Sequence, residues 1–304
     1  MKLADRNQFT VIAAGIALLG ALATSSANAQ NINVPTMQRI QEHGTIYVGH
    51  REASVPFSYY DGDKVVGYSK DLCDKVVATI KQQLNNPALN VVLVPVSSNS
   101  RIMALVTGMI DLECGSTTNT KIRQNTVAFS VTTFVSGVKA MVREDSGIKL
   151  LADLDGKVII TTAGTTTERT VKTLLATRKL AAREKSGLSH SDSFQQVVKK
   201  NADAFVIDDI LLSGLIANSA NGVPMRILDE NFAFEPYAIA MRRNDPEFKT
   251  VVDSSLKALM KSGELETIYN KWFLGPIPPY GASLNVPMSD LLKQAIQAPN
   301  DDGI

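Results

Sequence analysis

Short apolar runs alternate with amphipathic stretches along most of this chain, which is the pattern of α/β units. The pattern predicts strands over residues 45–49 and 90–96, the second of them buried, and a helix over residues 69–84 with apolar side chains at helical spacing. The other elements predicted in this part are helices over residues 37–42 and 100–106, a loop over residues 50–63, and strands over residues 109–114, 127–130 and 135–142.

The alternation of strand and helix begins again near residue 158 and predicts a second α/β unit. Its rhythm predicts strands over residues 158–161, 204–207, 225–228 and 237–241, and helices over residues 166–177, 193–199, 209–217, 247–261, 264–273 and 289–298. When the strand–helix rhythm begins again and the chain then comes back to a further strand and helix, one lobe is predicted to be inserted into another. Residues 30–136 and 237–304 would form the first lobe and residues 137–236 the second, with two connecting strands near residues 134–139 and 236–239 as a hinge.

The first 29 residues have the organisation of a secretory signal peptide. Lys2 and Arg6 precede an apolar run over residues 9–23, and Ala27 and Ala29 form a small-x-small cleavage site before Gln30. The apolar run is short for a membrane-spanning helix, which is the alternative. We therefore expect export of the mature chain to the periplasm.

Charge and composition narrow the classes of function. With 31 basic and 30 acidic residues, the chain has no net attraction for phosphates, so a nucleic-acid partner is not expected. Three histidines and two cysteines show no metal-ligand or redox spacing, and no cofactor is expected. Cys73 and Cys114 could form a disulfide in an oxidising compartment or remain two core thiols, and the sequence does not decide between them.

Residues 111–123, DLECGSTTNTKIR, carry a strand end followed by candidate binding chemistry. Gly115 lets the backbone turn, and the hydroxyls of Ser116 and Thr118 can both donate and accept hydrogen bonds. Arg123 supplies a planar fork for a carboxylate. In isolation, this stretch is more typical of a polar turn that caps a helix beside a surface arginine, and its surroundings are what favour a binding role.

Other polar side chains also follow predicted strands of the first lobe. Arg51 comes directly after one strand, and Ser98 and Arg101 lie at the junction of the next strand and helix. Their plain alternatives are a surface arginine and a helix cap. However, an arginine at a helix N-terminus opposes the helix dipole, a cost that an anionic ligand would relieve.

The second lobe offers three further candidates. Thr166 lies in a Gly-Thr run before a helix, where free amides and the dipole can hold an anion, although simple capping explains it as well. His190 precedes another helix, and a lone histidine is more often structural than a ligand contact. Of Asp208 and Asp209, one should cap the next helix, while the other, which we take to be Asp208, could accept from an ammonium group.

Ligands of open α/β sheets bind at the carboxyl ends of strands, so these side chains should meet in one cleft. The cleft would combine guanidinium groups, one histidine, one carboxylate and several hydroxyls. This chemistry fits a small molecule with two negative charges and one positive charge, such as an acidic amino acid. No nucleophile with its base, no paired catalytic carboxylates and no metal spacing are present in the sequence, so a catalytic role is not expected.

Several motifs carry a resemblance to a known family: GHREASVPFSYYD, SSNSR, DLECGSTTN, GTTTE, HSDSF, DDILLSG and KWFLGPIPP. From residue 34 to residue 299 the chain resembles the periplasmic glutamate/aspartate-binding proteins of ABC importers, within the bacterial extracellular solute-binding proteins of family 3. The resemblance implies an α/β, two-lobe periplasmic binding protein fold of type II, with lobes joined by two hinge strands. It also implies L-glutamate or L-aspartate as ligand and the permease subunits of an ABC transporter as partner.

The resemblance further implies a role for each candidate residue. Arg123, Thr118 and the region of Thr166 would hold the α-carboxylate of the ligand. Asp208, Ser116 and Thr118 would hold the α-ammonium. The side-chain carboxylate would be bound by Arg51, Ser98, Arg101 and His190, and we expect that histidine to be protonated when the ligand is bound.

Two alternatives belong to other classes of function. One is an enzyme on the same fold, such as a cyclohexadienyl dehydratase, which would need a general acid; His190 or Glu113 could be nominated. The other is a ligand sensor that acts on a receptor instead of a transporter. The sequence does not rank glutamate against aspartate, because one methylene changes binding by only about 1–3 kcal/mol. We expect a monomer.

Overall fold

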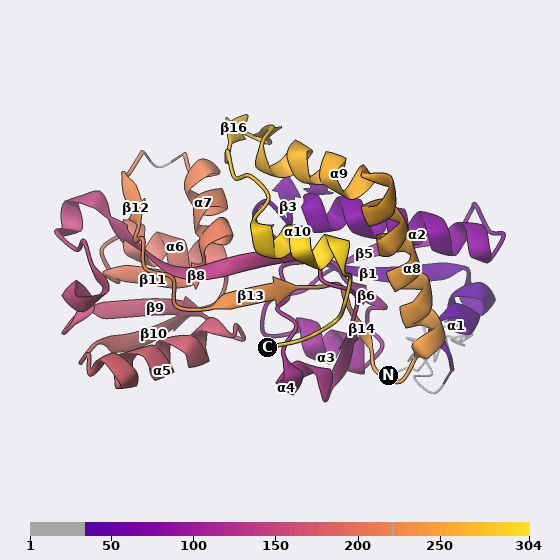
Figure 1. The fold of residues 1–304 in the computed structure, drawn as a ribbon, viewed down its shortest axis with the longest axis horizontal. Helices are drawn as coiled ribbons and strands as arrows, with labels where there is room; N and C mark the ends of the chain where they lie inside the picture. The colour runs from indigo at the N-terminus through magenta and orange to yellow at the C-terminus, as the bar shows by residue number, and fades with distance from the viewer. Residues whose placement is uncertain (1–33, 221) are drawn as a thin grey trace, which may run out of the picture.

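A computed structural model describes residues 34–220 and 222–304 and shows two α/β lobes joined by a pair of strands (Figure 1). This is the predicted two-lobe fold. The predicted signal peptide, residues 1–29, lies outside the described residues. Within the described part of the chain, no helix is both long enough and apolar enough to cross a membrane.

The sheet of the first lobe has the strand order β5-β1-β6-β14-β7. Its central strand β1 is parallel to β5 and β6, whereas β14 is antiparallel to β6 and β7. The bounds are β1 (Thr45–His50), β5 (Asn90–Pro95), β6 (Leu112–Glu113), β7 (Val127–Phe129) and β14 (Ala240–Arg242). The helices of this lobe are α1 (Thr36–His43), α2 (Tyr68–Gln83), α3 (Arg101–Val106), α4 (Lys121–Gln124), α8 (Pro246–Ser262) and α9 (Glu264–Phe273).

Two predictions for this lobe were wrong. The predicted loop at residues 50–63 contains β2 (Ala53–Ser54) and β3 (Ser58–Asp61), which pair with β4 (Lys64–Val66) in a small sheet. The strand predicted as buried, β5, has no buried residue. It lies at the edge of the sheet, where its apolar side chains are covered from one side only, and an apolar run alone does not distinguish an edge from a centre.

The sheet of the second lobe has the order β10-β9-β11-β8-β12. The strands are β8 (Phe134–Arg143), β9 (Val158–Thr162), β10 (Arg183–Gly187), β11 (Ala204–Asp208) and β12 (Met225–Ile227). Two 3-10 turns, Glu144–Ser146 and Leu151–Leu154, follow β8, and the helices are α5 (Thr167–Arg178), α6 (His190–Val198) and α7 (Asp209–Ala217). Strand β10 was not predicted, and α6 begins three residues before its predicted start because Ser189 caps it by accepting from Asp192 N at 3.1 Å.

Two strands connect the lobes, as predicted. β13 (Phe234–Tyr237) runs antiparallel to the first part of β8, and both pass between the lobes in Figure 1. The strand predicted over residues 237–241 is in fact two, because the chain leaves β13 at Tyr237 and joins the other sheet as β14 at Ala240. Division of the chain at residues 136/137 and 236/237 remains a prediction.

An aromatic cluster fixes the hinge to the first lobe. Phe134, the first residue of β8, stacks on Phe273 with ring centroids 5.0 Å apart and meets Phe57 edge-on at 4.9 Å. Its strand partner Tyr237 also contacts Phe57, at 5.1 Å. Because these rings are buried together, we expect bending between the lobes to occur beyond them, along β8 and β13.

Cys73 and Cys114 form a disulfide, which answers the question that the sequence left open. It joins α2 to the residue after β6, across 41 positions of sequence and a Cα–Cα distance of 6.2 Å. Gly115 and Ser116 follow immediately, so the bond anchors the start of the polar segment that continues to Arg123.

The C-terminal part of the chain returns to the hinge. After a short ribbon of β15 (Pro276–Ile277) and β16 (Ala282–Ser283), the helix α10 (Asp290–Gln297) lies close to its predicted place. The last residues then hydrogen-bond to the first lobe: Thr132 N donates to Asn300 O at 2.9 Å and Lys121 N to Ile304 O at 2.8 Å. The tail therefore supports the segment around α4.

Candidate functional site

Arg51, Ser98 and Arg101 converge at the carboxyl ends of the first-lobe strands. Arg51 directly follows β1, and its Nη2 donates to Ser98 Oγ at 2.5 Å. Arg101, the first residue of α3, donates from Nη1 to Ser116 O at 3.2 Å. Both guanidinium groups are buried, so neither is a surface arginine, although Arg101 does lie in the first turn of α3.

Several nitrogen atoms of these guanidinium groups have no partner. Within residues 34–220 and 222–304, Nε and Nη1 of Arg51 and Nε of Arg101 are buried without a hydrogen bond. Burial, followed by the nearby charge of Arg101, lowers the pKa of Arg51 to about 9, so that Arg51 is still a cation at neutral pH. Buried cationic donors without acceptors are costly, and an anion would satisfy them.

The segment after β6 brings Ser116, Thr118 and Arg123 to the same place. A side chain at Gly115 would collide with Glu113 and Arg51, which explains the glycine at this position. The Ser116 hydroxyl donates to Ser54 Oγ at 3.3 Å. Arg123 donates from Nη1 to Thr118 O at 2.9 Å and from Nη2 to Gly164 O at 3.2 Å, so that it connects the two lobes.

The second lobe contributes Thr166 and His190. Thr166 is the residue before α5, and its hydroxyl donates to Glu235 Oε2 at 2.7 Å instead of capping the helix. His190 lies across the interface from Arg51, with its Nε2 3.4 Å from Arg51 Nη2. Because a guanidinium only donates, Nε2 is the acceptor, and Nδ1–H then donates to Thr162 Oγ1 at 3.1 Å.

His190 is therefore neutral in this structure. Its pKa lies well below the usual value because of burial, reinforced by the charges of Arg51 and Arg101. Protonation of His190 in the ligand-bound protein stays a prediction, and only the charge of a bound carboxylate could reverse these effects.

The prediction that one of Asp208 and Asp209 caps the next helix was wrong. Neither caps α7 with its side chain: Asp208 occupies the cap position without a capping hydrogen bond. Asp209 Oδ1 instead accepts from Ser136 Oγ at 2.9 Å and from Gly137 N at 3.3 Å, on the hinge strand β8. Asp208 is buried, its Oδ1 has no partner among the described residues, and burial and then the charge of Glu235 raise its pKa well above the usual value.

Two buried polar residues of the site, Glu235 and Tyr237, were missed from the sequence, and Glu113 was named only as a possible acid of the dehydratase alternative. Glu235, in β13, accepts from the hydroxyls of Thr118 and Thr166, one on each lobe. Glu113 accepts from Thr117 Oγ1 at 2.5 Å and lies close to Arg51. The Tyr237 hydroxyl lies next to Asp208 and interacts with it, which lowers the pKa of the Asp208 carboxyl against the larger effect of burial, although no hydrogen bond of good geometry joins the two within the described part of the chain. A charged residue flanked by apolar residues in a strand was the one available signal for Glu235.

All nine predicted residues thus lie at the facing surfaces of the two lobes. Their roles toward a ligand remain a prediction, but the arrangement has two poles: unpartnered cationic donors at Arg51 and Arg101, and an unpartnered carboxylate oxygen at Asp208. Across the described ranges, no group of His, Cys, Asp and Glu could hold a metal ion.

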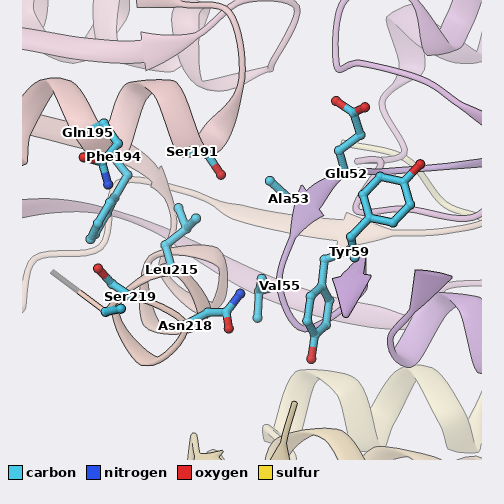
Figure 2. Close-up of a pocket in the computed structure, with 12 residues that line it drawn as sticks. Glu52, Ala53, Val55, Tyr59, Ser191, Phe194, Gln195, Leu215, Asn218 and Ser219 are labelled. Carbon is cyan, nitrogen blue, oxygen red and sulfur yellow. The ribbon is translucent and has the colours of Figure 1, made fainter. Parts of the chain in front are cut away.

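A separate pocket of about 460 Å³ opens at the outer edge of the interface and contains none of the predicted residues (Figure 2). Its walls come from both lobes, with Glu52 and Val55 facing Ser191 and Leu215 (Figure 2). Gly214 closes this edge from the second lobe, because a Cβ there would lie 2.7 Å from Val55 C. The two lobes are therefore in close contact in this structure.

The model of one protein family, the bacterial extracellular solute-binding proteins of family 3, matches residues 46–275. The chain belongs to this family. The matched residues include both sheets and both hinge strands, so the family accounts for the whole two-lobe architecture.

Two curated proteins are similar to this chain over most of their length. One is the glutamate/aspartate import solute-binding protein of Salmonella typhimurium, 42% identical over 88% of this chain and 89% of the relative. Another is the L-glutamate/L-aspartate-binding protein of Pseudomonas aeruginosa, 41% identical over 94% of this chain and 95% of the relative.

A solved structure is also similar to this chain. It is that of an ancestral amino acid-binding protein described as a precursor of cyclohexadienyl dehydratase, with a TM-score of 0.67 and 30% identity, covering 78% of this chain and 99% of that one. The similarity supports the same two-lobe fold.

Proposed function

We propose that this protein captures L-glutamate or L-aspartate between its lobes and delivers it to the permease subunits of an ABC importer. It would do so in the periplasm, as a monomer, after export by the signal peptide at residues 1–29. The names of the relatives from Salmonella typhimurium and Pseudomonas aeruginosa support this cargo. One observation of this chain carries the proposal: buried arginine nitrogens without partners face the interface at one pole and an unpartnered carboxylate oxygen faces it at the other.

The side-chain carboxylate of the ligand belongs at Arg51, Ser98, Arg101 and His190. The free nitrogens of Arg51 and Arg101 can donate to its oxygens, and charge-assisted bonds of this kind are the strong ones. His190 and Ser98 already contact Arg51, so a carboxylate bound there would touch both lobes.

The amino-acid end of the ligand belongs at Arg123 and Asp208. Arg123 lies between Thr118 and Gly164, and the N–H groups of its planar guanidinium can donate to an α-carboxylate. Ser116, Thr118, Thr166 and Asp208 offer acceptors at the same end, and Asp208 supplies the negative charge for the ammonium.

This arrangement favours an acidic side chain over its amide. Glutamine would leave the buried guanidinium groups with a neutral partner, and a buried charge that loses its counter-charge costs several kcal/mol. We therefore expect glutamine to bind at least about 100-fold more weakly than glutamate, which corresponds to about 2.7 kcal/mol.

The dehydratase alternative has less support. The related solved structure is itself named as an amino acid-binding protein, and the curated relatives are binding proteins for import. His190, one of the two nominated acids, is neutral between Thr162 and Arg51 and has no carboxylate partner among the described residues. The protein is therefore proposed to bind without turnover.

Calorimetric titration of the refolded, ligand-stripped protein tests the proposal, because refolding removes any amino acid that copurifies. L-glutamate, L-aspartate and L-glutamine are the three ligands. Tight one-to-one binding of both acids, with weak or no binding of the amide, is expected. If neither acid binds, the proposed cargo is wrong, and a prephenate-like substrate should then be assayed for turnover.

A further inference from the structure

A single buried carboxylate joins hydroxyl groups from both lobes. Glu235 lies in the hinge strand β13, and its Oε2 accepts from Thr118 Oγ1 of the first lobe and from Thr166 Oγ1 of the second. Backbone bonds hold the first of these contacts in place: Asn119 N donates to Pro236 O at 2.8 Å, and Ala238 N to Thr117 O at 3.2 Å. Glu235 and Thr118 are therefore fixed neighbours, independent of any ligand.

These bonds determine what the two hydroxyls can offer to a ligand. A hydroxyl has one proton and two lone pairs. Because both protons are donated to Glu235, the oxygens of Thr118 and Thr166 can only accept a further hydrogen bond. A carboxylate needs donors, whereas an ammonium needs acceptors. The two hydroxyls therefore suit the ammonium group of an amino acid, and Asp208, whose charge interacts with that of Glu235, lies near enough to add a negative charge.

We propose that Glu235 is a positioning residue that turns Thr118 and Thr166 into acceptors, and thereby makes the site select ligands that carry an ammonium group. This rests on the proposed function and refines it. It assigns the hydroxyl of Thr166 to the ammonium, whereas the resemblance placed its region at the α-carboxylate; a backbone amide there can still serve the carboxylate. Since the two threonines lie on opposite lobes, the ammonium also bridges the closed interface.

The test compares L-glutamate with glutarate, which has the same two carboxylates and no ammonium. Dissociation constants are measured for the wild type and Glu235→Gln by calorimetry, with glutarate followed by displacement of L-glutamate. In E235Q the negative charge that holds both threonine protons is lost, and a neutral amide oxygen accepts from them more weakly, so the two hydroxyls are freer to turn and donate elsewhere. The variant should raise the dissociation constant for L-glutamate by about tenfold or more. It should change the dissociation constant for glutarate by less than about threefold, so that the ratio of the two constants falls.

Glu230→Gln is the matched control, because it removes an exposed carboxylate that pairs with Arg178. It should leave both dissociation constants unchanged. If E235Q weakens both ligands equally or leaves discrimination intact, the inference is wrong while the proposed function stands. If E230Q lowers discrimination as much as E235Q, long-range charge explains the effect and the inference is also wrong. A wild type that binds neither acid nor glutarate would instead refute the proposed function.

A second pair of variants keeps the test valid if E235Q does not fold. Thr166→Val removes the acceptor, and Thr166→Ser keeps it. T166V should lower the discrimination between L-glutamate and glutarate by about tenfold, and T166S should restore it. Equal discrimination in the two variants would overturn the inference.

Discussion

Substitution of Asp208 by asparagine should stabilise the ligand-free protein and at the same time weaken ligand binding. Asp208 is 5% exposed, its Oδ1 has no partner among the described residues, and its pKa is raised by burial and then by the charge of Glu235. Asparagine has the same shape without the charge. Burial penalises the charged carboxylate more than a neutral amide, and a difference of about 1–3 kcal/mol is the expected gain of D208N at neutral pH.

The sign of this effect depends on pH in a defined way. An acid whose pKa is higher in the folded protein than in the unfolded chain favours folding below the unfolded pKa of about 3.9, and this advantage is lost as pH rises through the folded pKa. Wild type and D208N should therefore have similar stability near pH 4, and the advantage of D208N should grow as the pH rises. A gain of 1 kcal/mol corresponds to about 2–4 °C in Tm for a chain of this size class.

Binding should change in the opposite direction. Removal of one partner of a buried charge pair costs about 2–5 kcal/mol, so the dissociation constant for L-glutamate should rise from about 30-fold to a few thousandfold. Thermal unfolding of ligand-stripped protein and calorimetric titration measure the two effects. Asp209→Asn is the control: it should lower Tm, because Asp209 accepts from Ser136 and Gly137, and should bind L-glutamate normally. A D208N protein with lower Tm and unchanged affinity would show that Asp208 is a helix cap.

Three further predictions concern the disulfide, the histidine and lobe closure. Replacement of both Cys73 and Cys114 by serine should lower the free energy of unfolding by about 4 kcal/mol, as loop entropy predicts for 41 residues; an unchanged denaturation midpoint would contradict this. A bound carboxylate should raise the low pKa of His190, so the affinity of the wild type for L-glutamate should fall as the pH rises from about 6 to 8. The affinity of H190Q should not change over this range. A wild-type affinity that does not depend on pH would refute the protonation of His190. Gly214→Ala should leave Tm unchanged or higher, because alanine favours helix α7. It should nevertheless raise the dissociation constant for L-glutamate by about tenfold, because its Cβ meets Val55 when the lobes close. A normal affinity would show that closure tolerates the extra methyl group.

The sequence predicted the site well because chemistry and position pointed the same way. Arg51, Ser98, Arg101 and Asp208 follow strands that end at the facing edges of the two sheets, and the structure buries all four. Their grouping could be predicted without knowledge of side-chain packing, because parallel strands place their carboxyl ends at the same edge of a sheet. The contact between Arg51 and His190, however, depends on how the lobes meet, and local pattern contains no information about that.

The elements that sequence reasoning missed share a different cause. Strand β10, REKSG, has four exposed residues and one buried residue, so no apolar pattern marks it, and its pairing with β9 alone makes it a strand. Glu235 is buried while its neighbour Phe234 is 56% exposed, the reverse of what hydrophobicity predicts. That reversal is the kind of local conflict expected at a functional position, where polar contacts outweigh the hydrophobic preference.

The same atoms can account for both selectivity and closure. In the closed arrangement, Nε and Nη1 of Arg51 and Nε of Arg101 are buried without partners among the described residues. Each such atom costs about 1–3 kcal/mol, whereas in a separated arrangement water would satisfy it, so the empty protein should favour separated lobes by several kcal/mol. A ligand with two carboxylates and an ammonium supplies the missing partners in the closed state alone. A differential affinity of about 5.5 kcal/mol moves such an equilibrium from 1:99 to 99:1, which is within the sum of these costs. Glutamine restores the ammonium contacts but not the counter-charge at the arginines, so it should close the lobes less completely as well as bind less tightly.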